Sequence, residues 1–285
     1  MVEMQSGQQR RSAAGQAKKK NELLDTVQTV GSALLIALLI KTLIFQPYTI
    51  PSASEEPNLY EGDYIVVSKW AYGYSHHSIL FSPPLFKGRL FFTPPRRGDV
   101  IVFKLPSSGH IDYIKRLVGL PGDRIQVSNG RLSVNGKLLG VDDRKSVELH
   151  DHDEPEAGAW VRETNPEGRQ YVTQIHGAGA EAADNTGVYV VPPHCYFMMG
   201  DNRENSLDSR FDPGLSPDDP KLGGCGWDSR LDSFLPPEAG VGFVPEENLV
   251  GRAEMVMLSW HKGANILKPW TWLDLRLDRF LKRIN

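Results

Sequence analysis

The longest apolar run in the chain lies near its N-terminus and predicts a membrane-spanning helix. From Thr26 to Phe45 the sequence reads TVQTVGSALLIALLIKTLIF, which matches the ~20 residues that cross the hydrocarbon of a bilayer. Only Lys41 interrupts this run, and a lysine near the end of a span extends its ammonium to the headgroups. No second run approaches this length, so the pattern predicts a single transmembrane helix.

The residues before the run are polar and basic, and they set the predicted orientation. Five basic residues lie between positions 10 and 20. Because basic residues favour the cytoplasmic side, we expect a disordered cytoplasmic tail over 1–25 and export of the chain after Pro47. A cleavable signal peptide is the alternative. The long basic region, with Pro47 and Pro51 where a small-residue cleavage site would lie, favours an uncleaved anchor.

The exported part contains short runs of β-branched and aromatic residues that follow turn signals. Gly-Asp pairs at 62–63, 98–99 and 122–123 precede YIVVSKW, VIVFKL and RIQVSNGRLSVNG. Such runs predict strands, and residues 62–136 are expected to form a meander of antiparallel strands. Strand-like runs return at GVYVVPPHCYFMMG and NLVGRAEMVMLSW.

Polar stretches divide these strands into predicted domains. The fold class is expected to be mainly β, with an antiparallel core sheet and a smaller β-rich subdomain behind one transmembrane helix over 26–45. The predicted parts are a first part of the core at 46–123, an inserted subdomain at 124–188, and a second part of the core at 189–262 with a polar insertion at 211–240.

The last segment, 263–285, has apolar residues at helical spacing and basic residues between them. The sequence WTWLDLRLDRFLKRIN predicts an amphipathic helix. Trp270 and Trp272 suit a membrane interface, and docking on the protein's own core is the equal alternative.

Composition narrows the function classes and raises one question of covalent structure. With 285 residues and a formal net charge of −3, the chain has no polyanion-binding signature, so nucleic acid is not an expected partner. The 27 glycines and 20 prolines agree with many short elements joined by turns.

Export would place Cys195 and Cys225 in an oxidising compartment, which leaves a disulfide and two free thiols as alternatives.

Two serines, Ser52 and Ser54, follow the apolar run in the sequence IPSASEEPNL. A serine hydroxyl is a weak nucleophile unless a base takes its proton. None of the eight histidines stands in a recognisable triad setting. His150 and His152 lie in an acidic loop that is expected to be a solvated face, so no metal is predicted.

A lysine is the other candidate base. In IDYIKRLVG, alternation places Ile111, Tyr113, Lys115 and Leu117 on one face of a strand. Loss of hydration among apolar neighbours disfavours the ammonium, as a lysine general base requires. An exposed lysine on an edge strand is the alternative for Lys115.

A third block, MMGDNRENSLDSR, predicts a turn held by side-chain hydrogen bonds. Ser206, Asp208 and Arg210 alternate in it. Asp208 and Arg210 are expected to form an ion pair, and the Ser206 hydroxyl is placed to orient an amine.

The blocks IPSASEEPNL, DYIKRLVGLPGD and GDNRENSLDSR follow a membrane anchor in this order. From about Phe45 to Trp260 the chain resembles the bacterial type I signal (leader) peptidases. The resemblance implies that Ser54 is the nucleophile, that the Ser52 hydroxyl helps to form the oxyanion hole, and that Lys115 is the general base. It also implies that Ser206 holds the lysine amine and that Asp208 and Arg210 form a supporting ion pair.

The same resemblance implies a membrane-anchored serine endopeptidase that removes signal peptides from exported preproteins and requires no cofactor. Its partners would be preprotein signal peptides and the lipid bilayer. The chain would be a single-pass protein of the bacterial inner (cell) membrane, with a cytoplasmic N-terminus and a periplasmic or otherwise extracytoplasmic catalytic domain. Substrate would lie extended along a strand edge lined by Ile50, Pro51, Tyr113 and Ile114.

The opening motif departs from the family pattern, P-S-x-S-M-x-P-T, at two positions. Glu55 replaces methionine and Asn58 replaces threonine. A carboxylate beside the nucleophile would favour the charged form of Lys115. We therefore expect either that Glu55 points to solvent or that activity is altered. The alternative function is an inactive, membrane-anchored binding domain; a self-cleaving repressor would need a DNA-binding module, which the sequence lacks.

Overall fold

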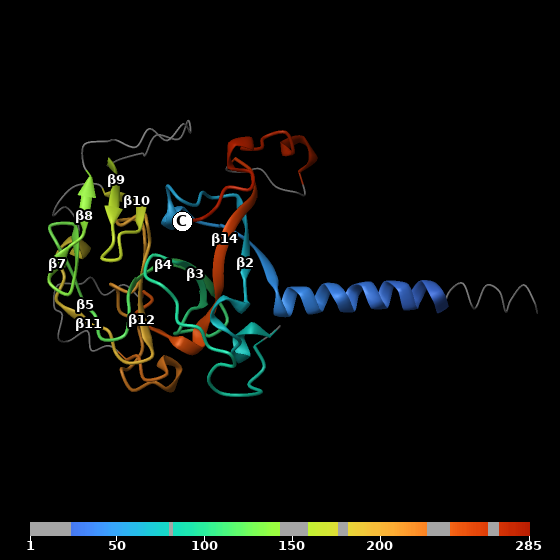
Figure 1. Cartoon of the computed structure of the whole chain (residues 1–285), viewed down its shortest axis with the longest axis horizontal. Helices are drawn as coiled ribbons and strands as arrows, with labels where there is room; N and C mark the ends of the chain where they lie inside the picture. The colour runs from blue at the N-terminus through green and yellow to red at the C-terminus, as the bar shows by residue number, and fades with distance from the viewer. Residues whose placement is uncertain (1–23, 80–81, 143–158, 176–181, 227–239, 262–267) are drawn as a thin grey trace, which may run out of the picture. The chain divides into compact units, whose positions relative to one another are not determined.

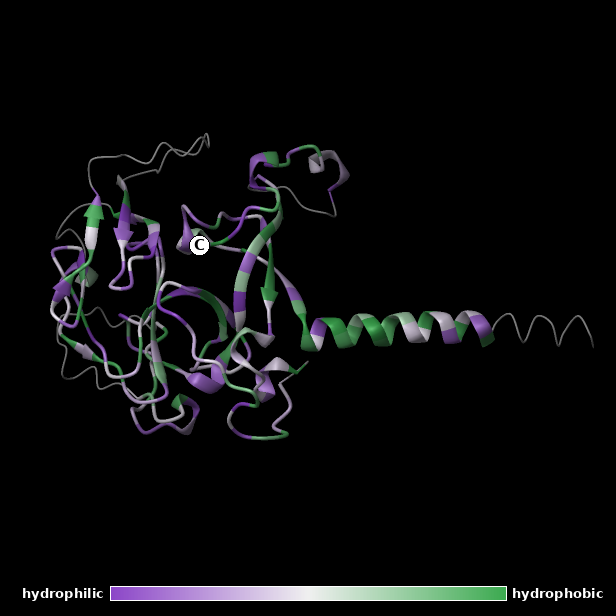
Figure 2. Ribbon diagram, in the orientation of Figure 1, coloured by the Kyte–Doolittle hydropathy of each residue, from purple (hydrophilic) through white to green (hydrophobic). Residues whose placement is uncertain are grey.

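The N-terminal apolar run forms a helix, Leu24–Leu43, that is long and apolar enough to cross a membrane. The computed structural model describes residues 24–79, 82–142, 159–175, 182–226, 240–261 and 268–285. The chain divides into two units, Met1–Ile44 and Phe45–Asn285. Figure 2 colours most of the helix as hydrophobic. The helix stops before the predicted end at residue 45 because Phe45 begins a strand.

The second unit is mainly β, as predicted (Figure 1). Its main sheet has seven strands in the order β1-β2-β14-β3-β4-β12-β13, and neighbouring strands are antiparallel. Their bounds are Phe45–Thr49, Asp63–Ser68, Leu249–Ser259, Val100–Lys104, Asp112–Gly119, Cys195–Met199 and Val244–Pro245.

The strands between 62 and 136 do not form the predicted meander. β14, from the far end of the chain, lies between β2 and β3, and it pairs with both. Alternation in a sequence identifies a strand and its buried face, but it does not identify the strand's neighbours. The sequence therefore predicted the strands correctly, but the predicted order of the strands in the sheet was wrong.

Two smaller sheets contain the strands between Arg124 and Val190. One has the order β11-β5-β6-β7 and the other β10-β9-β8. Their bounds are Tyr189–Val190, Arg124–Ser128, Arg131–Val134 and Lys137–Leu138, then Gln170–Ile175, Ala159–Thr164 and Gly140–Asp142. Most of these strands fall in the predicted subdomain, 124–188, whose bounds stay a prediction. The acidic loop with His150 and His152 lies outside the described residues.

The hydrophobic core covers both faces of the central strand β3. Val100 and Val102 pack with Ile65 in one cluster, while Ile101 and Phe103 pack in another. Because neither face of β3 meets water, this strand gives its neighbour β4 a rigid support.

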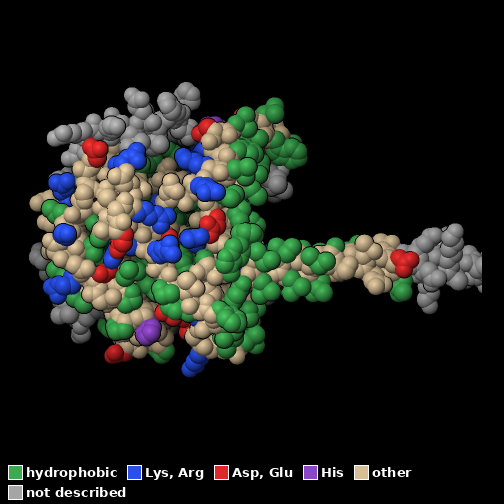
Figure 3. Space-filling view, in the orientation of Figure 1, with side chains coloured by type: hydrophobic (Ala, Val, Ile, Leu, Met, Phe, Trp, Pro, Cys, Tyr) green, Lys and Arg blue, Asp and Glu red, His purple; other side chains and the backbone are tan. Residues whose placement is uncertain are grey.

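The C-terminal tail is not the predicted amphipathic helix. Residues 268–285 form two short 3-10 turns, Pro269–Thr271 and Leu277–Arg279, and isolated bridges to β14 and to Trp260. Arg279, which a helix would have exposed, is 1% exposed and lies 2.6 Å from Asp63. Trp270 and Leu273 are largely exposed, and Figure 3 shows hydrophobic side chains over this part of the surface. Burial of two of the basic residues, Arg276 and Arg279, explains why helical spacing was misleading here.

A disulfide joins Cys195 to Cys225 with a Cα–Cα distance of 5.7 Å, which decides between the two alternatives. The bond ties residues of the polar insertion to β12 across a separation of 30 residues. In the chain-entropy account, closing such a loop contributes about 3–4 kcal/mol.

Replacing both cysteines by serine is expected to lower the free energy of unfolding by about 3–4 kcal/mol, because the unfolded chain gains conformational freedom. Denaturant unfolding of the detergent-solubilised protein without reductant measures this. Reduced wild-type protein is the control and should match the variant. Equal stability of variant and oxidised wild type, or recovery of both cysteines as free thiols, would contradict the expectation.

Candidate functional site

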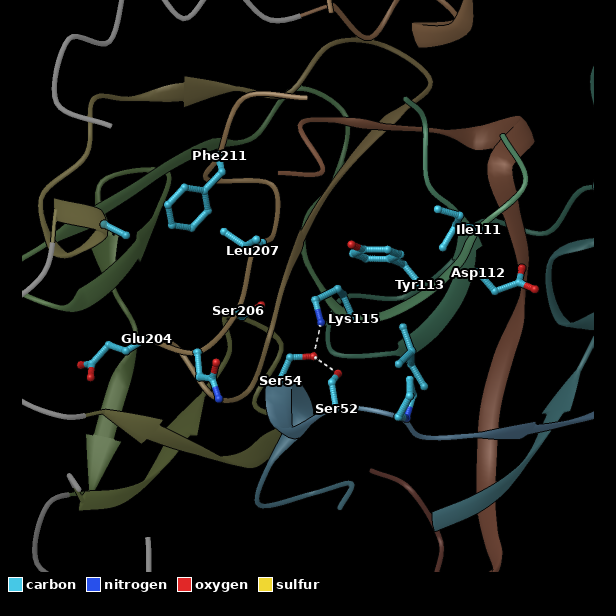
Figure 4. A pocket seen from close by; sticks show the side chains of 14 residues that line it. Ser52, Ser54, Ile111, Asp112, Tyr113, Lys115, Glu204, Ser206, Leu207 and Phe211 are labelled. Atoms are coloured by element: carbon cyan, nitrogen blue, oxygen red, sulfur yellow. Dashed lines mark hydrogen bonds between the residues drawn. The ribbon is translucent and has the colours of Figure 1, made fainter. Parts of the chain in front are cut away.

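The serine and the lysine singled out by their motifs meet in the structure. Ser54 lies in a 3-10 turn, Ala53–Glu55, and Lys115 lies in the middle of β4. Nζ of Lys115 is 2.5 Å from Oγ of Ser54 (Figure 4). Lys115 is 3% exposed, so the alternative of an exposed edge lysine is wrong.

Both residues are held by main-chain structure. Lys115 is opposite Ile101 of β3, so that its strand is fixed by the hydrophobic core. The serine turn is held from the other side by Asn202, whose backbone N–H donates to the Ser54 carbonyl at 3.2 Å and whose side chain donates to the Ala53 carbonyl at 3.3 Å. The Ser54–Lys115 contact therefore joins two anchored segments, not two mobile side chains.

A cavity of about 800 Å³ opens at this contact. Figure 4 shows Leu207 and Phe211 across it from Tyr113 and Ile111. Its lining includes Pro51, Ser52, Tyr113, Ile114 and Ser206. Ser52 is exposed, and its Oγ is 3.4 Å from Oγ of Ser54. Ile50, a sequence candidate for the lining, is instead 3% exposed in the hydrophobic core and does not line this cavity.

Asp208 and Arg210 form a buried, two-point ion pair beside the cavity. Arg210 Nε and Nη2 donate to the two carboxylate oxygens at 2.8 and 2.9 Å, and the Gly200 backbone N–H donates at 3.0 Å. Burial alone would raise the pKa of Asp208, but these donors lower it below its ordinary value. The pair therefore stays charged and fixes the turn that carries Ser206.

Ser206 lies in the cavity wall, but its hydroxyl does not bond to the lysine. Oγ of Ser206 is buried and has no hydrogen-bond partner among the described residues. Gly200 packs directly against it, since an added Cβ would stand 2.3 Å from this oxygen and 2.5 Å from the Ser54 carbonyl oxygen. A glycine is thus needed for the two turns to approach.

Glu55 does not point to solvent, contrary to one of our expectations. Its side chain is 1% exposed, and Oε1 is 3.3 Å from Nζ of Lys115. Burial, opposed by the charges of Lys115 and Arg116 and reinforced by Asp201, raises the pKa of Glu55 to about 8. The carboxyl group next to the serine is thus in direct contact with the candidate base.

Asn58, the second departure from the family pattern, has a structural role. Its Nδ2 donates to the Val172 carbonyl at 2.6 Å and to Oδ2 of Asp201 at 2.7 Å. Asp201 in turn receives two bonds of 2.7 Å from Arg116. The family pattern gave no role to Arg116 and Asp201, although they lie inside the blocks DYIKRLVGLPGD and GDNRENSLDSR. Asn58 connects the serine turn to this ion pair and to β10.

Among the described residues, no group of three or more His, Cys, Asp or Glu side chains is arranged to hold a metal ion. The groups that meet at the Ser54–Lys115 contact are serine hydroxyls, the amine of Lys115 and the carboxyl group of Glu55. This set suits proton transfer and nucleophilic attack.

Comparison with known proteins identifies a family and two close relatives in sequence. The family described as signal peptidase, peptidase S26, matches residues 23–260. A signal peptidase I of Rickettsia typhi is 35% identical over 269 residues, which cover 88% of this chain and 90% of the relative. The signal peptidase I of Rickettsia felis is also 35% identical, with coverage of 88% and 89%.

A solved structure was also matched. The crystal structure of a signal peptidase I from Enterococcus faecalis V583 has a TM-score of 0.29 and 23% sequence identity. The match covers 56% of this chain and 97% of that chain.

Proposed function

We propose a Ser54–Lys115 mechanism on the premise that the chain belongs to the signal peptidase family, peptidase S26. Membership makes the protein a peptidase that acts on signal peptides, and the Leu24–Leu43 helix indicates a membrane-anchored protein. The observation that carries the proposal is the 2.5 Å contact between Nζ of Lys115 and Oγ of Ser54 at an open cavity.

In this mechanism the neutral amine of Lys115 takes the proton of Ser54 as Oγ attacks the carbonyl carbon at the cleavage site. The Ser54 backbone N–H and the Ser52 hydroxyl donate to the resulting oxyanion. The scissile C–N bond then breaks, and the leaving amine takes the proton from the ammonium of Lys115. Lys115 next takes a proton from water as the water oxygen attacks the carbonyl carbon of the acyl ester. The C–Oγ bond then breaks, and Oγ of Ser54 takes a proton from the ammonium of Lys115.

The edge of β4 supports an extended substrate. β12 pairs with β4 at Arg116, Leu117 and Gly119, and the preceding residues, 112–115, line the cavity instead. A peptide in this space would add a strand to β4, with small side chains facing Tyr113 and Leu207. In the proposed topology the N-terminus is cytoplasmic, the helix spans the bacterial inner membrane and the cavity is extracytoplasmic, where a translocated signal peptide ends.

Incubation of the detergent-solubilised protein with a purified preprotein tests the proposal. We expect one cut after a small-x-small motif at the end of the signal peptide, unaffected by a metal chelator. Binding of the preprotein without cleavage would instead support the alternative function, a membrane-anchored binding domain.

Ser52→Ala is expected to lower kcat on the order of 10²–10³-fold with little change in KM, because one oxyanion donor is lost. The rate of preprotein processing at saturating substrate measures this. Ser216→Ala, an exposed serine outside the cavity lining, is the matched control. A wild-type kcat in Ser52→Ala would remove Ser52 from the oxyanion hole.

A further inference from the structure

Glu55 differs from the other buried carboxylates around the site. Asp201, Asp208 and Glu163 each receive two hydrogen bonds from an arginine, respectively Arg116, Arg210 and Arg203. The hydrogen-bonding contact of the Glu55 carboxyl group is with the amine of Lys115, and Oε2 has no hydrogen-bond partner among the described residues. The buried carboxyl group of Glu55 is thus bonded to the candidate base instead of to an arginine.

The amine of Lys115 lies between oxygens of two successive residues, Oγ of Ser54 at 2.5 Å and Oε1 of Glu55 at 3.3 Å. A neutral amine has two N–H donors and one lone pair. If one N–H donates to Oε1, the rotation of the amine is fixed and the lone pair is free to face Oγ. The hydroxyl of Ser206, to which the family resemblance gives the task of holding the amine, has no such contact with it.

We propose that Glu55 is a positioning residue that orients the Lys115 amine toward Ser54 and takes over this task from Ser206. The inference rests on the proposed function, in which Lys115 is the general base. During attack, the Oγ proton passes to the lone pair of Nζ while an N–H of the same nitrogen continues to donate to Oε1. No proton of Glu55 is transferred in this step.

The charge of Glu55 decides how it affects the base. Three charged groups face it: Lys115 and Arg116 from β4, and Asp201 from the turn after β12. Since burial raises the pKa of Glu55 to about 8, the carboxyl group is mainly neutral at neutral pH, and its carbonyl oxygen still accepts a hydrogen bond. As the pH rises through about 8 the carboxylate of Glu55 forms beside the amine, and a negative charge beside an amine works against its use as a base.

Two substitutions separate orientation from charge. Glu55→Gln keeps an acceptor oxygen but cannot ionise, whereas Glu55→Met, the residue of the family pattern, removes the acceptor. We expect Glu55→Gln to keep a near-wild-type kcat, with the rising limb of kcat/KM moved to lower pH. We expect Glu55→Met to lose on the order of 10²-fold in kcat with little change in KM, because the amine is misaligned. Ser206→Ala is expected to lose less kcat than Glu55→Met, because Oγ of Ser206 has no hydrogen bond to the amine.

The experiment measures kcat and KM against pH for preprotein cleavage by the full-length protein in detergent. Glu56→Gln, at the adjacent and half-buried carboxylate, is the control and should retain both the kcat and the pH profile of wild type. Thermal unfolding of each variant establishes that it is folded. Should Glu55→Met not fold, the pH profile of Glu55→Gln decides.

An unmoved rising limb in Glu55→Gln, or an unchanged kcat in folded Glu55→Met, would overturn the inference. A loss in Ser206→Ala as large as that expected for Glu55→Met would return the orienting task to Ser206. These outcomes require an active wild type that Ser54→Ala inactivates. A wild-type protein that does not cleave would overturn the proposed function first, and the role of Glu55 with it.

Discussion

Ser54→Ala is expected to lower the rate of preprotein cleavage on the order of 10⁶-fold, the loss typical of removing a nucleophile from a catalytic unit. Oγ of Ser54 lies 2.5 Å from the amine of Lys115 at the cavity, and alanine offers no atom that can form the acyl ester. The fold should be unaffected, because alanine keeps the backbone hydrogen bond that the Ser54 carbonyl accepts from Asn202. Single-turnover processing with excess enzyme measures the residual rate.

Ser216→Ala serves as the matched control for this variant as well, and it should process preprotein at the wild-type rate. The binding of uncleaved preprotein to Ser54→Ala should be retained, since most of the cavity lining is unchanged. Cleavage by folded Ser54→Ala at a substantial fraction of the wild-type rate would eliminate Ser54 as the nucleophile.

Lys115→Met is expected to lower the rate of preprotein cleavage by a similar factor, because removing either member of a catalytic pair abolishes the contribution of both. Methionine has a similar length and is unbranched, but it has no group that accepts a proton. Lys115 is 3% exposed and is paired with the carboxyl group of Glu55. Loss of the amine leaves that group unpartnered, so the double variant Lys115→Met/Glu55→Met should restore any stability lost in Lys115→Met without restoring activity.

Preprotein processing and denaturant unfolding, measured on the same preparations, check both parts of this expectation. Lys137→Met, at an exposed position in β7, is the control and should be fully active. Activity in the double variant would show that Lys115 is not the base.

The strands and the candidate residues could be predicted because they depend on local pattern. Alternation around Lys115 placed it on an apolar face, and β4 buries it there. The Gly-Asp turns likewise preceded β2, β3 and β5 at the expected positions. In each case the alternation of side chains between the two faces is a property of the strand itself.

Features that depend on distant parts of the chain could not be predicted in this way. The position of β14 between β2 and β3 depends on pairing between residues that are 146 to 196 positions apart in the sequence. The sequence around Glu55 leaves two alternatives, a side chain that faces solvent or an altered activity, because local pattern does not show whether the carboxyl group is buried. Its burial against Lys115 follows from the packing of the serine turn onto β4. The tail was misjudged for a similar reason, since Asp63 holds Arg279.

The central claim is that Ser54 forms the acyl-enzyme. The most direct test is an acid-quenched, single-turnover reaction of the full-length protein with a preprotein, followed by peptide mapping by mass spectrometry. We predict that, at early times, the peptide containing Ser54 carries the signal peptide as an ester and that this adduct is absent in Ser54→Ala. An adduct on any other side chain, or one that persists in Ser54→Ala, would contradict the claim.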